Sequence, residues 1–218
     1  LILSIILLVT FLFVCWYIPY IKPVSVKAVE HLDSVLEIHM IDVGQAESIL
    51  VVQGEHAMLI DTGDMFDGKT VVRYLQSVGI NKLDAVIITH YHNDHSGGIH
   101  DVLSAIEVKK VVGMRGKYIS TAQELFWYSD MQISRTVSSM VHLKRISLES
   151  PYKEAGVLRT MWLGDAEVDF LSQETHTNIV NNKSSVMKVS YKDVSALFTG
   201  DSQKEVEDSL LEAEIDVS

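Results

Sequence analysis

Three histidines and one aspartate lie within six residues in the segment Thr89-His-Tyr-His-Asn-Asp-His-Ser-Gly-Gly98. Alternate side chains of an extended segment point the same way, so His90, His92 and Asp94 can converge on one side of the chain. His95 follows at the start of the next turn. Imidazole and carboxylate groups without a thiolate suit zinc, manganese or iron(II). The pattern therefore predicts a metal site rather than a solvated histidine-rich loop.

The elements around this segment must place it at the end of a strand. The apolar run Leu83–Thr89 predicts a buried strand that leads directly into it. Strand and helix patterns alternate in both halves of the chain, which favours two sheets flanked by helices in one α/β sandwich. Strands are predicted at Val35–Val43, Ser48–Gln53, Ala57–Ile60, Val108–Val112, Glu167–Leu171, Ser185–Tyr191 and Ser195–Thr199, and helices at Lys69–Ser77, Ile99–Ile106, Ser120–Val137 and Gln203–Ala213. Residues 142–163 show no clear pattern.

The first residues have the character of a membrane anchor. Leu1–Ile21 is apolar except for Ser4 and Thr10, and about twenty such residues span a bilayer as a helix. A cleaved signal peptide is one alternative, but no small-residue cleavage site lies near the end of the stretch. A buried helix of a larger fold is the other, and such helices are seldom apolar on every face. We expect a transmembrane anchor or signal-anchor at residues 1–21, a linker at 22–34 and a domain at 35–218.

The membrane is thus the first partner that the sequence predicts. Lys22 and Lys27 follow the apolar stretch, but they do not decide its orientation without the residues before Leu1. For a lone N-terminal anchor, we expect a protein of the cell membrane whose catalytic domain is extracellular. The sequence gives no indication of the oligomeric state.

Composition narrows the chemistry further. The 218 residues carry a net charge of −11, which argues against a broad basic surface for nucleic acid, although a small basic cluster can still contact a phosphate. Cys15 is the only cysteine, so the region after the anchor has neither disulfides nor thiolate ligands. A Ser-His-Asp hydrolase is disfavoured because the histidines cluster together and the sequence has no G-x-S-x-G element.

Five motifs in a fixed order carry a resemblance to a known family. They are Asp42-Val-Gly-Gln45, Ile60-Asp-Thr-Gly63, the histidine segment at 89–98, Asn181-Asn-Lys-Ser184 and Leu197-Phe-Thr-Gly-Asp201. With them, residues 36–216 resemble the metallo-β-lactamase superfamily and, within it, the hydrolase domain of ComEC-type competence DNA-uptake proteins and its stand-alone relatives. The resemblance implies an αββα sandwich of the α/β (α+β) class, with metal ions at the edge where loops of both halves meet.

The resemblance also implies a ligand set for two divalent ions, with zinc preferred and manganese as the alternative. His90 and His92 would bind the first ion, and Asp94 and His95 would bind the second. Asp201 would bridge the two ions.

Other residues are implied to complete or support the site. A third histidine for the first ion is expected between the histidine segment and Asp201, where His142 and His176 are the candidates. His176 is preferred because it lies closer to the Asn181 motif. Asp61 would support the histidine segment through hydrogen bonds, and Asn181, Asn182 and Ser184 would line the site or hold the strand beside it.

The sequence departs from the pattern of its relatives in two places. Ala46-Glu47 stands where they usually carry Gly-Asp, so the carboxylate is kept but the backbone freedom of glycine is lost. The relatives also continue into a strand and an HHGS element, whereas this sequence ends at Ser218. We therefore expect the domain to be truncated at its C-terminus and its activity to be impaired.

The resemblance implies hydrolysis by a metal-bridging hydroxide, with Asp94 as the catalytic residue that orients it or passes a proton to the leaving group. Phosphodiesters, including DNA, are the preferred substrates. Another ester or amide bond, such as a phosphocholine ester or a lactam, is the first alternative, because one fold can serve many reactions. A non-catalytic, membrane-displayed domain is the second. A diiron redox role is disfavoured because His92 stands where that branch carries glutamate.

Overall fold

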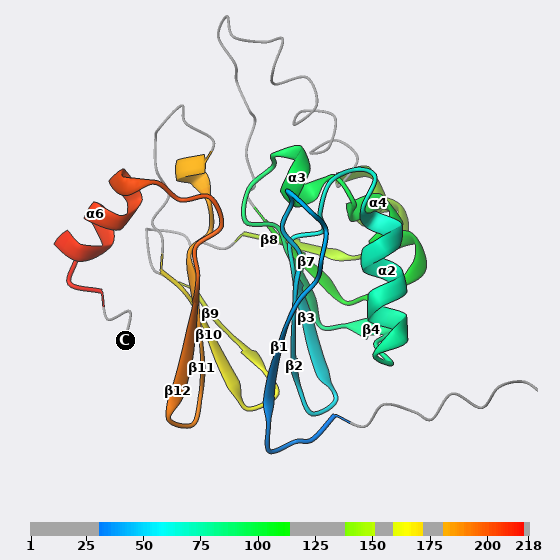
Figure 1. Cartoon of the computed structure of the whole chain (residues 1–218), viewed down its shortest axis with the longest axis horizontal. Helices are drawn as coiled ribbons and strands as arrows, with labels where there is room; N and C mark the ends of the chain where they lie inside the picture. The colour runs from blue at the N-terminus through cyan, green and yellow to red at the C-terminus, as the bar shows by residue number, and fades with distance from the viewer. Residues whose placement is uncertain (1–30, 114–137, 151–158, 172–180, 216–218) are drawn as a thin grey trace, which may run out of the picture.

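The computed structural model describes residues 31–113, 138–150, 159–171 and 181–215. Their two larger β-sheets pack face to face (Figure 1), and two further short strands pair with each other. The strands are β1 Leu36–Met40, β2 Ile49–Gln53, β3 His56–Ile60, β4 Lys82–Leu83, β5 Ala85–Ile87, β6 Glu107–Val108, β7 Lys110–Val112, β8 Ser147–Glu149, β9 Thr160–Leu163, β10 Ala166–Phe170, β11 Met187–Tyr191 and β12 Val194–Phe198. The helices are α2 Gly68–Ser77, α3 Asn93–Ser96, α4 Ile99–Ala105 and α6 Lys204–Glu212, with a 3-10 turn, η3, at Asn181–Lys183. Residues 138–144 are also helical.

The first sheet has six strands in the order β1-β2-β3-β5-β7-β8. β1, β2 and β3 are antiparallel neighbours, whereas β3, β5, β7 and β8 run parallel. In the β3–β5 register Ile60 lies opposite Ile87, so the chain leaves both strands at the same edge of the sheet. That edge receives the loop after β3, which begins with Asp61, and the histidine segment after β5.

The second sheet is an antiparallel meander in the order β12-β11-β10-β9. Met187 at the start of β11 lies opposite Phe198 at the end of β12. The segment before β11 and the segment after β12 therefore emerge together. These two segments contain the Asn181 motif and Asp201.

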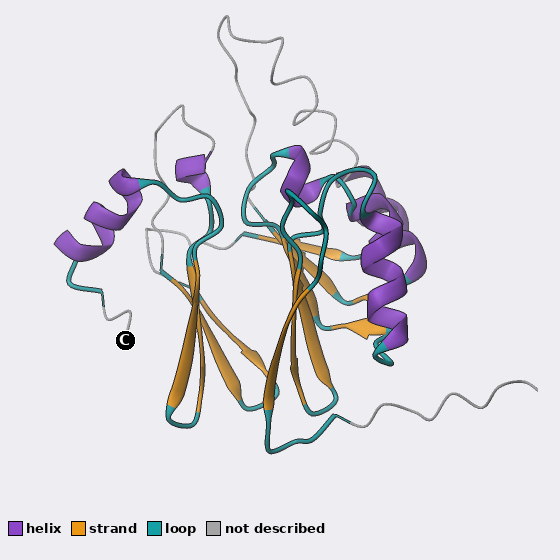
Figure 2. Ribbon diagram, in the orientation of Figure 1, coloured by secondary structure: helices purple, strands orange, loops and turns teal. Residues whose placement is uncertain are grey.

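Two apolar cores hold these layers together. In β2, Leu50 and Val52 face the core that the helices cover, while Ile49 and Val51 face the core between the sheets. This division follows from the period of two along a strand. Because both faces are buried, the strand is a continuous apolar run in the sequence. α2 and α4 bury their apolar sides in the first core and cover the outer face of the first sheet (Figure 2).

The predicted sandwich of two sheets with helices is confirmed, but its details differ. The run Leu83–Thr89 is not one strand, because Asp84 separates β4 from β5 and its carboxylate contacts the ring of His56 at 3.0 Å. β5 then ends at Ile87, two residues earlier than expected. β8 and β9 lie within residues 142–163, where the sequence showed no pattern.

A helix also packs on the outer side of the second sheet, near one end of its strands. α6 packs against Leu171 and Val186, which lie just beyond the strand ends. Trp162 and Leu197 are exposed on the outer face of this sheet. Leu171 and Val186 continue the outward-facing positions of β10 and β11, because Phe170 and Met187 face the core between the sheets, so α6 lies on the outer side of this sheet, as the resemblance implied.

Several expectations concern segments that are not described. The anchor at 1–21, most of the linker at 22–34 and the helix Ser120–Val137 lie outside the described residues, as does His176. Among the residues that are described, no helix is both long enough and apolar enough to cross a membrane.

Gly98 lies where the histidine segment packs on the loop after β3. A Cβ at this position would lie 2.2 Å from the backbone oxygen of Thr62 and 2.8 Å from Cα of Gly68. These are backbone atoms, which cannot move aside as the end of a flexible side chain can. We expect Gly98→Ala to lower the free energy of unfolding by about 1–3 kcal/mol, measured by urea denaturation. Ser104→Ala, at an exposed position of α4, is the control; equal stability of the two variants would contradict this packing.

Candidate metal centre

The loop after β3 begins with a fully buried carboxylate, that of Asp61. One of its oxygens accepts a hydrogen bond from the backbone N–H of Thr89 at 2.8 Å, and the other accepts one from the Thr89 hydroxyl at 2.6 Å. The backbone of Asp61 has a φ of 57°, a left-handed conformation that aspartate tolerates better than most residues. Asp61 thus fixes the start of the histidine segment without facing solvent.

The first two histidines of the segment lie against each other. Nε2 of His90 and Nδ1 of His92 are 2.9 Å apart. On its other side, Nδ1 of His90 lies 3.2 Å from the Thr89 hydroxyl and 3.4 Å from Oγ of Ser184. His90 is fully buried and His92 is half-buried, so the pair opens toward solvent on the His92 side.

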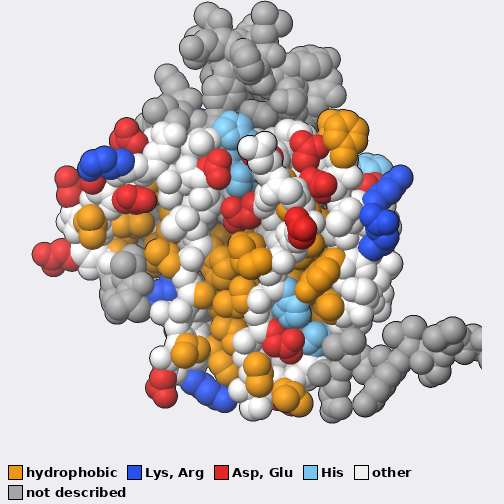
Figure 3. Space-filling model, in the orientation of Figure 1, with side chains coloured by type: hydrophobic (Ala, Val, Ile, Leu, Met, Phe, Trp, Pro, Cys, Tyr) orange, Lys and Arg blue, Asp and Glu red, His pale blue; other side chains and the backbone are white. Residues whose placement is uncertain are grey.

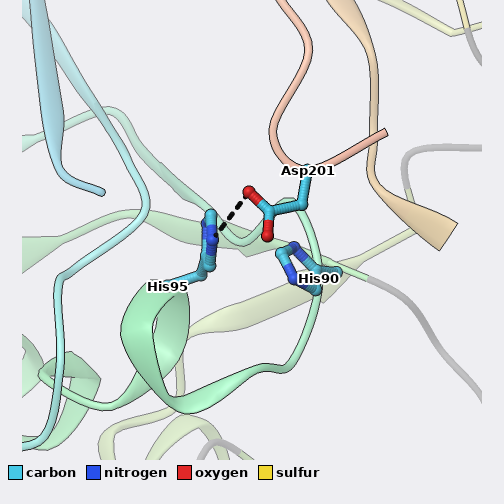
Figure 4. A group of neighbouring side chains, drawn as sticks. All are labelled: His90, His95 and Asp201. Atoms are coloured by element: carbon cyan, nitrogen blue, oxygen red, sulfur yellow. Dashed lines mark ion pairs between the residues drawn. The ribbon is translucent and has the colours of Figure 1, made fainter. Parts of the chain in front are cut away.

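The third histidine links the two halves of the sandwich. Nδ1 of His95 contacts the Asp61 carboxylate at 2.7 Å. Its Nε2 lies 3.3 Å from Oδ1 of Asp201, which comes from the loop after β12 (Figure 4). Oδ2 of Asp94 lies 4.0 Å from the same nitrogen. The rings of His90 and His95 have centroids 4.2 Å apart, so the structure brings His90, His92, Asp94, His95 and Asp201 together.

The second half of the chain docks on Thr89. The backbone oxygen of Thr89 accepts a hydrogen bond from the N–H of Ser185 at 3.0 Å. The backbone of Gly200 passes so close that a Cβ there would lie 3.1 Å from the Thr89 side chain. The N–H of Asp201 donates to Oγ of Ser184 at 3.2 Å. These contacts bring Asp201 to the histidines, although it is distant from them in sequence.

The remaining predicted residues have different places. Asn182 is buried and ties η3 to α6, since its Nδ2 donates to Glu205 at 3.2 Å and its Oδ1 accepts from the N–H of Gln203 at 3.1 Å. Asn181 is half-buried, and its backbone oxygen accepts from the N–H of Ser184. His142 is exposed. His176 lies outside the described residues, so a third ligand for the first ion stays a prediction.

The histidines differ in charge. Burial, together with the neighbouring rings of His95 and His92, lowers the pKa of His90 to about 2, so His90 is neutral and has a free lone pair at neutral pH. Burial also lowers the pKa of His95, but the hydrogen bond that His95 donates to Asp61 and the charges of Asp61, Asp201 and Glu47 outweigh it and raise the pKa to about 9. Without an ion, the site therefore holds a proton on His95.

Glu47 is a site residue that the sequence marked only as a departure from its relatives. One of its carboxylate oxygens forms a group with Asp61 and His95, whose ligand atoms lie within 4.8 Å of one another. The backbone of Glu47 joins two loops. Its N–H donates to the backbone oxygen of Asp94 at 3.0 Å, and its backbone oxygen accepts from the N–H of Gly63 at 2.8 Å. Burial and the charge of Asp61 raise the pKa of Glu47 to about 7. Its tie to the histidine segment comes from folding, and no spacing in the sequence shows it.

These residues fit divalent metal ions. Ligand atoms of His90, His95 and Asp201 lie within 4.8 Å of one another. Neutral imidazole and carboxylate are the donors that zinc takes in the absence of thiolates, and manganese accepts the same oxygen donors. Figure 3 shows histidine and carboxylate side chains gathered together on one end of this face, with Lys and Arg at its periphery. The excess of negative charge there is what a cation site requires.

Comparison with known proteins identifies chains that are similar to this one in sequence or in fold. ComE operon protein 3 of Bacillus subtilis is 27% identical over 199 residues, which cover 83% of this chain and 24% of that protein. A hydroxyacylglutathione hydrolase of Vibrio campbellii is 36% identical over 88 residues, which cover 39% of this chain and 33% of that protein. The chain therefore spans a third or less of the length of these relatives. A metallo-beta-lactamase from Cronobacter sakazakii superposes with a TM-score of 0.53 and 14% identity over 74% of this chain and 60% of its own, a likeness of fold alone.

The family assignment comes from the sequence as a whole. The model of the metallo-beta-lactamase superfamily matches residues 41–216, which include the loop of Glu47, the histidine segment and Asp201. The family binds divalent metals, and the histidine and carboxylate groups at the edge of this sandwich are of the matching kind. The chain belongs to the metallo-beta-lactamase superfamily.

Proposed function

We propose that the chain is a metal-dependent hydrolase of phosphodiesters, including DNA, that uses two divalent ions, zinc in preference to manganese. The observation that carries the proposal is the meeting of His90, His95 and Asp201, whose ligand atoms lie within 4.8 Å although they come from both halves of the sandwich. Two divalent ions held there would supply a deprotonated water at neutral pH and polarise the bond under attack. No nucleophilic side chain is then required.

Residues of the chain have separate roles in binding the ions, orienting the water and positioning the ligands. His90 and His92 would hold one ion, Asp94 and His95 would hold the other, and Asp201 would bind both. The Asp94 carboxylate is part-exposed beside His95, which suits it to orient the attacking water or to pass a proton to the leaving group. Asp61 keeps the His95 ring in place and leaves its Nε2 facing the site.

The phosphodiester substrate is supported by the match along most of the chain. The similarity to ComE operon protein 3 covers 83% of this chain, whereas that to hydroxyacylglutathione hydrolase covers 39%. The resemblance to ComEC-type DNA-uptake domains extends to motifs in both halves of the sandwich. Fold alone does not choose among these substrates, because one scaffold serves many reactions.

The similarity to hydroxyacylglutathione hydrolase favours a second candidate, a hydrolase of another ester bond. A thioester would meet the same ligands, since the chemistry at the carbonyl needs the same water and the same polarisation. Turnover of a thioester with no turnover of a phosphodiester would select this candidate.

The membrane anchor and the extracellular position of the domain are part of the proposal. Deleting residues 1–21 is expected to move the protein from the membrane fraction to the soluble fraction, because about twenty apolar residues hold a helix in a bilayer. Fractionation followed by immunoblotting measures this. A full-length chain that is already soluble would contradict the anchor.

Substitution of the site residues tests the hydrolase directly. We expect His92→Ala and Asp94→Ala each to abolish metal-dependent turnover of a generic phosphodiester. Each should also lower the number of ions bound per chain, measured by elemental analysis. His100→Ala is the matched control, since His100 is exposed on α4 just after the segment. Turnover that survives both substitutions would exclude the metal mechanism.

The affinity for metal should depend on pH through His95. The pKa of His95, about 9, lies above its ordinary value of 6.5. Protonation of His95 therefore stabilises the folded, metal-free protein. This stabilisation is complete below pH 6.5 and is lost as the pH rises through about 9. A metal ion must displace this proton. We expect the affinity for metal to rise about tenfold per pH unit as the pH increases toward 9 and to level off above it. Competition with a chromophoric chelator measures this, and an affinity that does not change over the range would contradict it.

A further inference from the structure

The loop between β3 and α2 exposes two apolar side chains. Phe66 is 84% exposed and Met65 is 58% exposed. Within the described parts of the chain, Phe66 is the most exposed of the large apolar side chains. Burying such a side chain is worth about 1.5–3 kcal/mol, which the fold gives up here.

Hydrogen bonds fix the backbone of the turn at residues 64–67, whose tip is formed by Met65 and Phe66. The N–H of Phe66 donates to Oδ1 of Asp64 at 3.1 Å. The N–H of Asp64 donates to Oδ2 of Asp67 at 3.2 Å, and the N–H of Asp67 donates to the backbone oxygen of Asp64 at 2.9 Å. The aromatic ring is therefore presented on a fixed turn, which reduces the entropy lost when a ligand binds.

The same turn is attached to the histidine segment. Nδ2 of Asn93 donates to the second oxygen of the Asp64 carboxylate, and Asn93 lies between His92 and Asp94. The turn also packs closely on Gly97, where a Cβ would lie 2.3 Å from the backbone nitrogen of Met65. The turn is thus attached directly to the segment that carries His92, Asp94 and His95.

The chemistry of the tip selects its ligand. Asp64 and Asp67 flank Phe66 with negative charge, so the turn does not attract a phosphate. It offers an apolar aromatic face instead. Every nucleobase has a π-face, and stacking of bases on aromatic side chains tolerates any sequence.

We propose that Phe66 stacks on a base of the strand whose phosphodiester lies at the metal centre. The inference rests on the proposed function and deepens it, because it names the substrate as a single-stranded or locally unpaired nucleic acid. In a duplex both faces of an interior base are already stacked. Met65 extends the same apolar surface.

The test removes the two partners of the proposed stacking contact separately: the base, by using an abasic strand, and the aromatic ring, by substituting Phe66. The full chain loaded with zinc is assayed on an oligothymidine strand and on a strand of equal length made of abasic tetrahydrofuran units. Phe66→Ala should lower kcat/KM on oligothymidine about 5- to 150-fold and leave the abasic strand unaffected. Phe66→Tyr should restore turnover. Val194→Ala is the control, since Val194 is exposed at the end of β12 remote from Asp201.

Other results would overturn the proposal. An equal loss on both strands would show that Phe66 supports the loop, and no loss on either would show that it does not touch substrate. If Phe66→Ala weakens binding to lipid vesicles and leaves DNA turnover unchanged, the tip serves a membrane surface. If the unmodified chain cleaves neither strand but hydrolyses a thioester, the phosphodiester function itself fails.

Discussion

The buried carboxylate of Asp61 accepts hydrogen bonds from both polar groups of Thr89 and lies 2.7 Å from Nδ1 of His95. These contacts join the end of β3 to the end of β5 and to the first turn of α3. The left-handed backbone of Asp61, with φ of 57°, costs on the order of 1 kcal/mol or more. The fold keeps this conformation because three bonds determine it at once. The carboxylate therefore fixes Thr89 and His95, between which the other histidines of the segment lie.

Thr89 extends the constraint to the other half of the sandwich. Its side chain binds Asp61, its backbone oxygen accepts the N–H of Ser185, and Gly200 packs against its side chain. A shift of Asp61 would therefore move the loop that carries Asp201 as well. One hydrogen-bonded residue thus sets the distance between ligands that lie far apart in the sequence.

What the sequence predicted depends on how local the signal is. The histidine segment could be identified from its spacing, because alternate residues of an extended chain share a side. The buried strands could be identified because they are apolar on both faces. Asp201 could be assigned only through a family resemblance, since the docking of Gly200 on Thr89 has no local pattern. Glu47 was missed as a site residue because its closeness to Asp61 and His95 is created by two backbone hydrogen bonds between loops. β8 was missed because none of its three residues is fully buried, and β9 because only Met161 and Leu163 are buried, so neither forms a continuous apolar run.

The charges around the histidines also bear on the proposed phosphodiester substrate, which is an anion and would meet an acidic protein. The charges of Asp61, Asp201 and Glu47 raise the pKa of His95, and burial holds His90 neutral. Divalent ions balance such a group of carboxylates and turn an acidic edge into one that attracts phosphate. With a chain charge of −11, the electrostatic affinity for the proposed substrate would come from the ions rather than from a basic surface. An uncharged aromatic contact beside them then adds affinity without adding charge, and this is the chemistry that Phe66 offers.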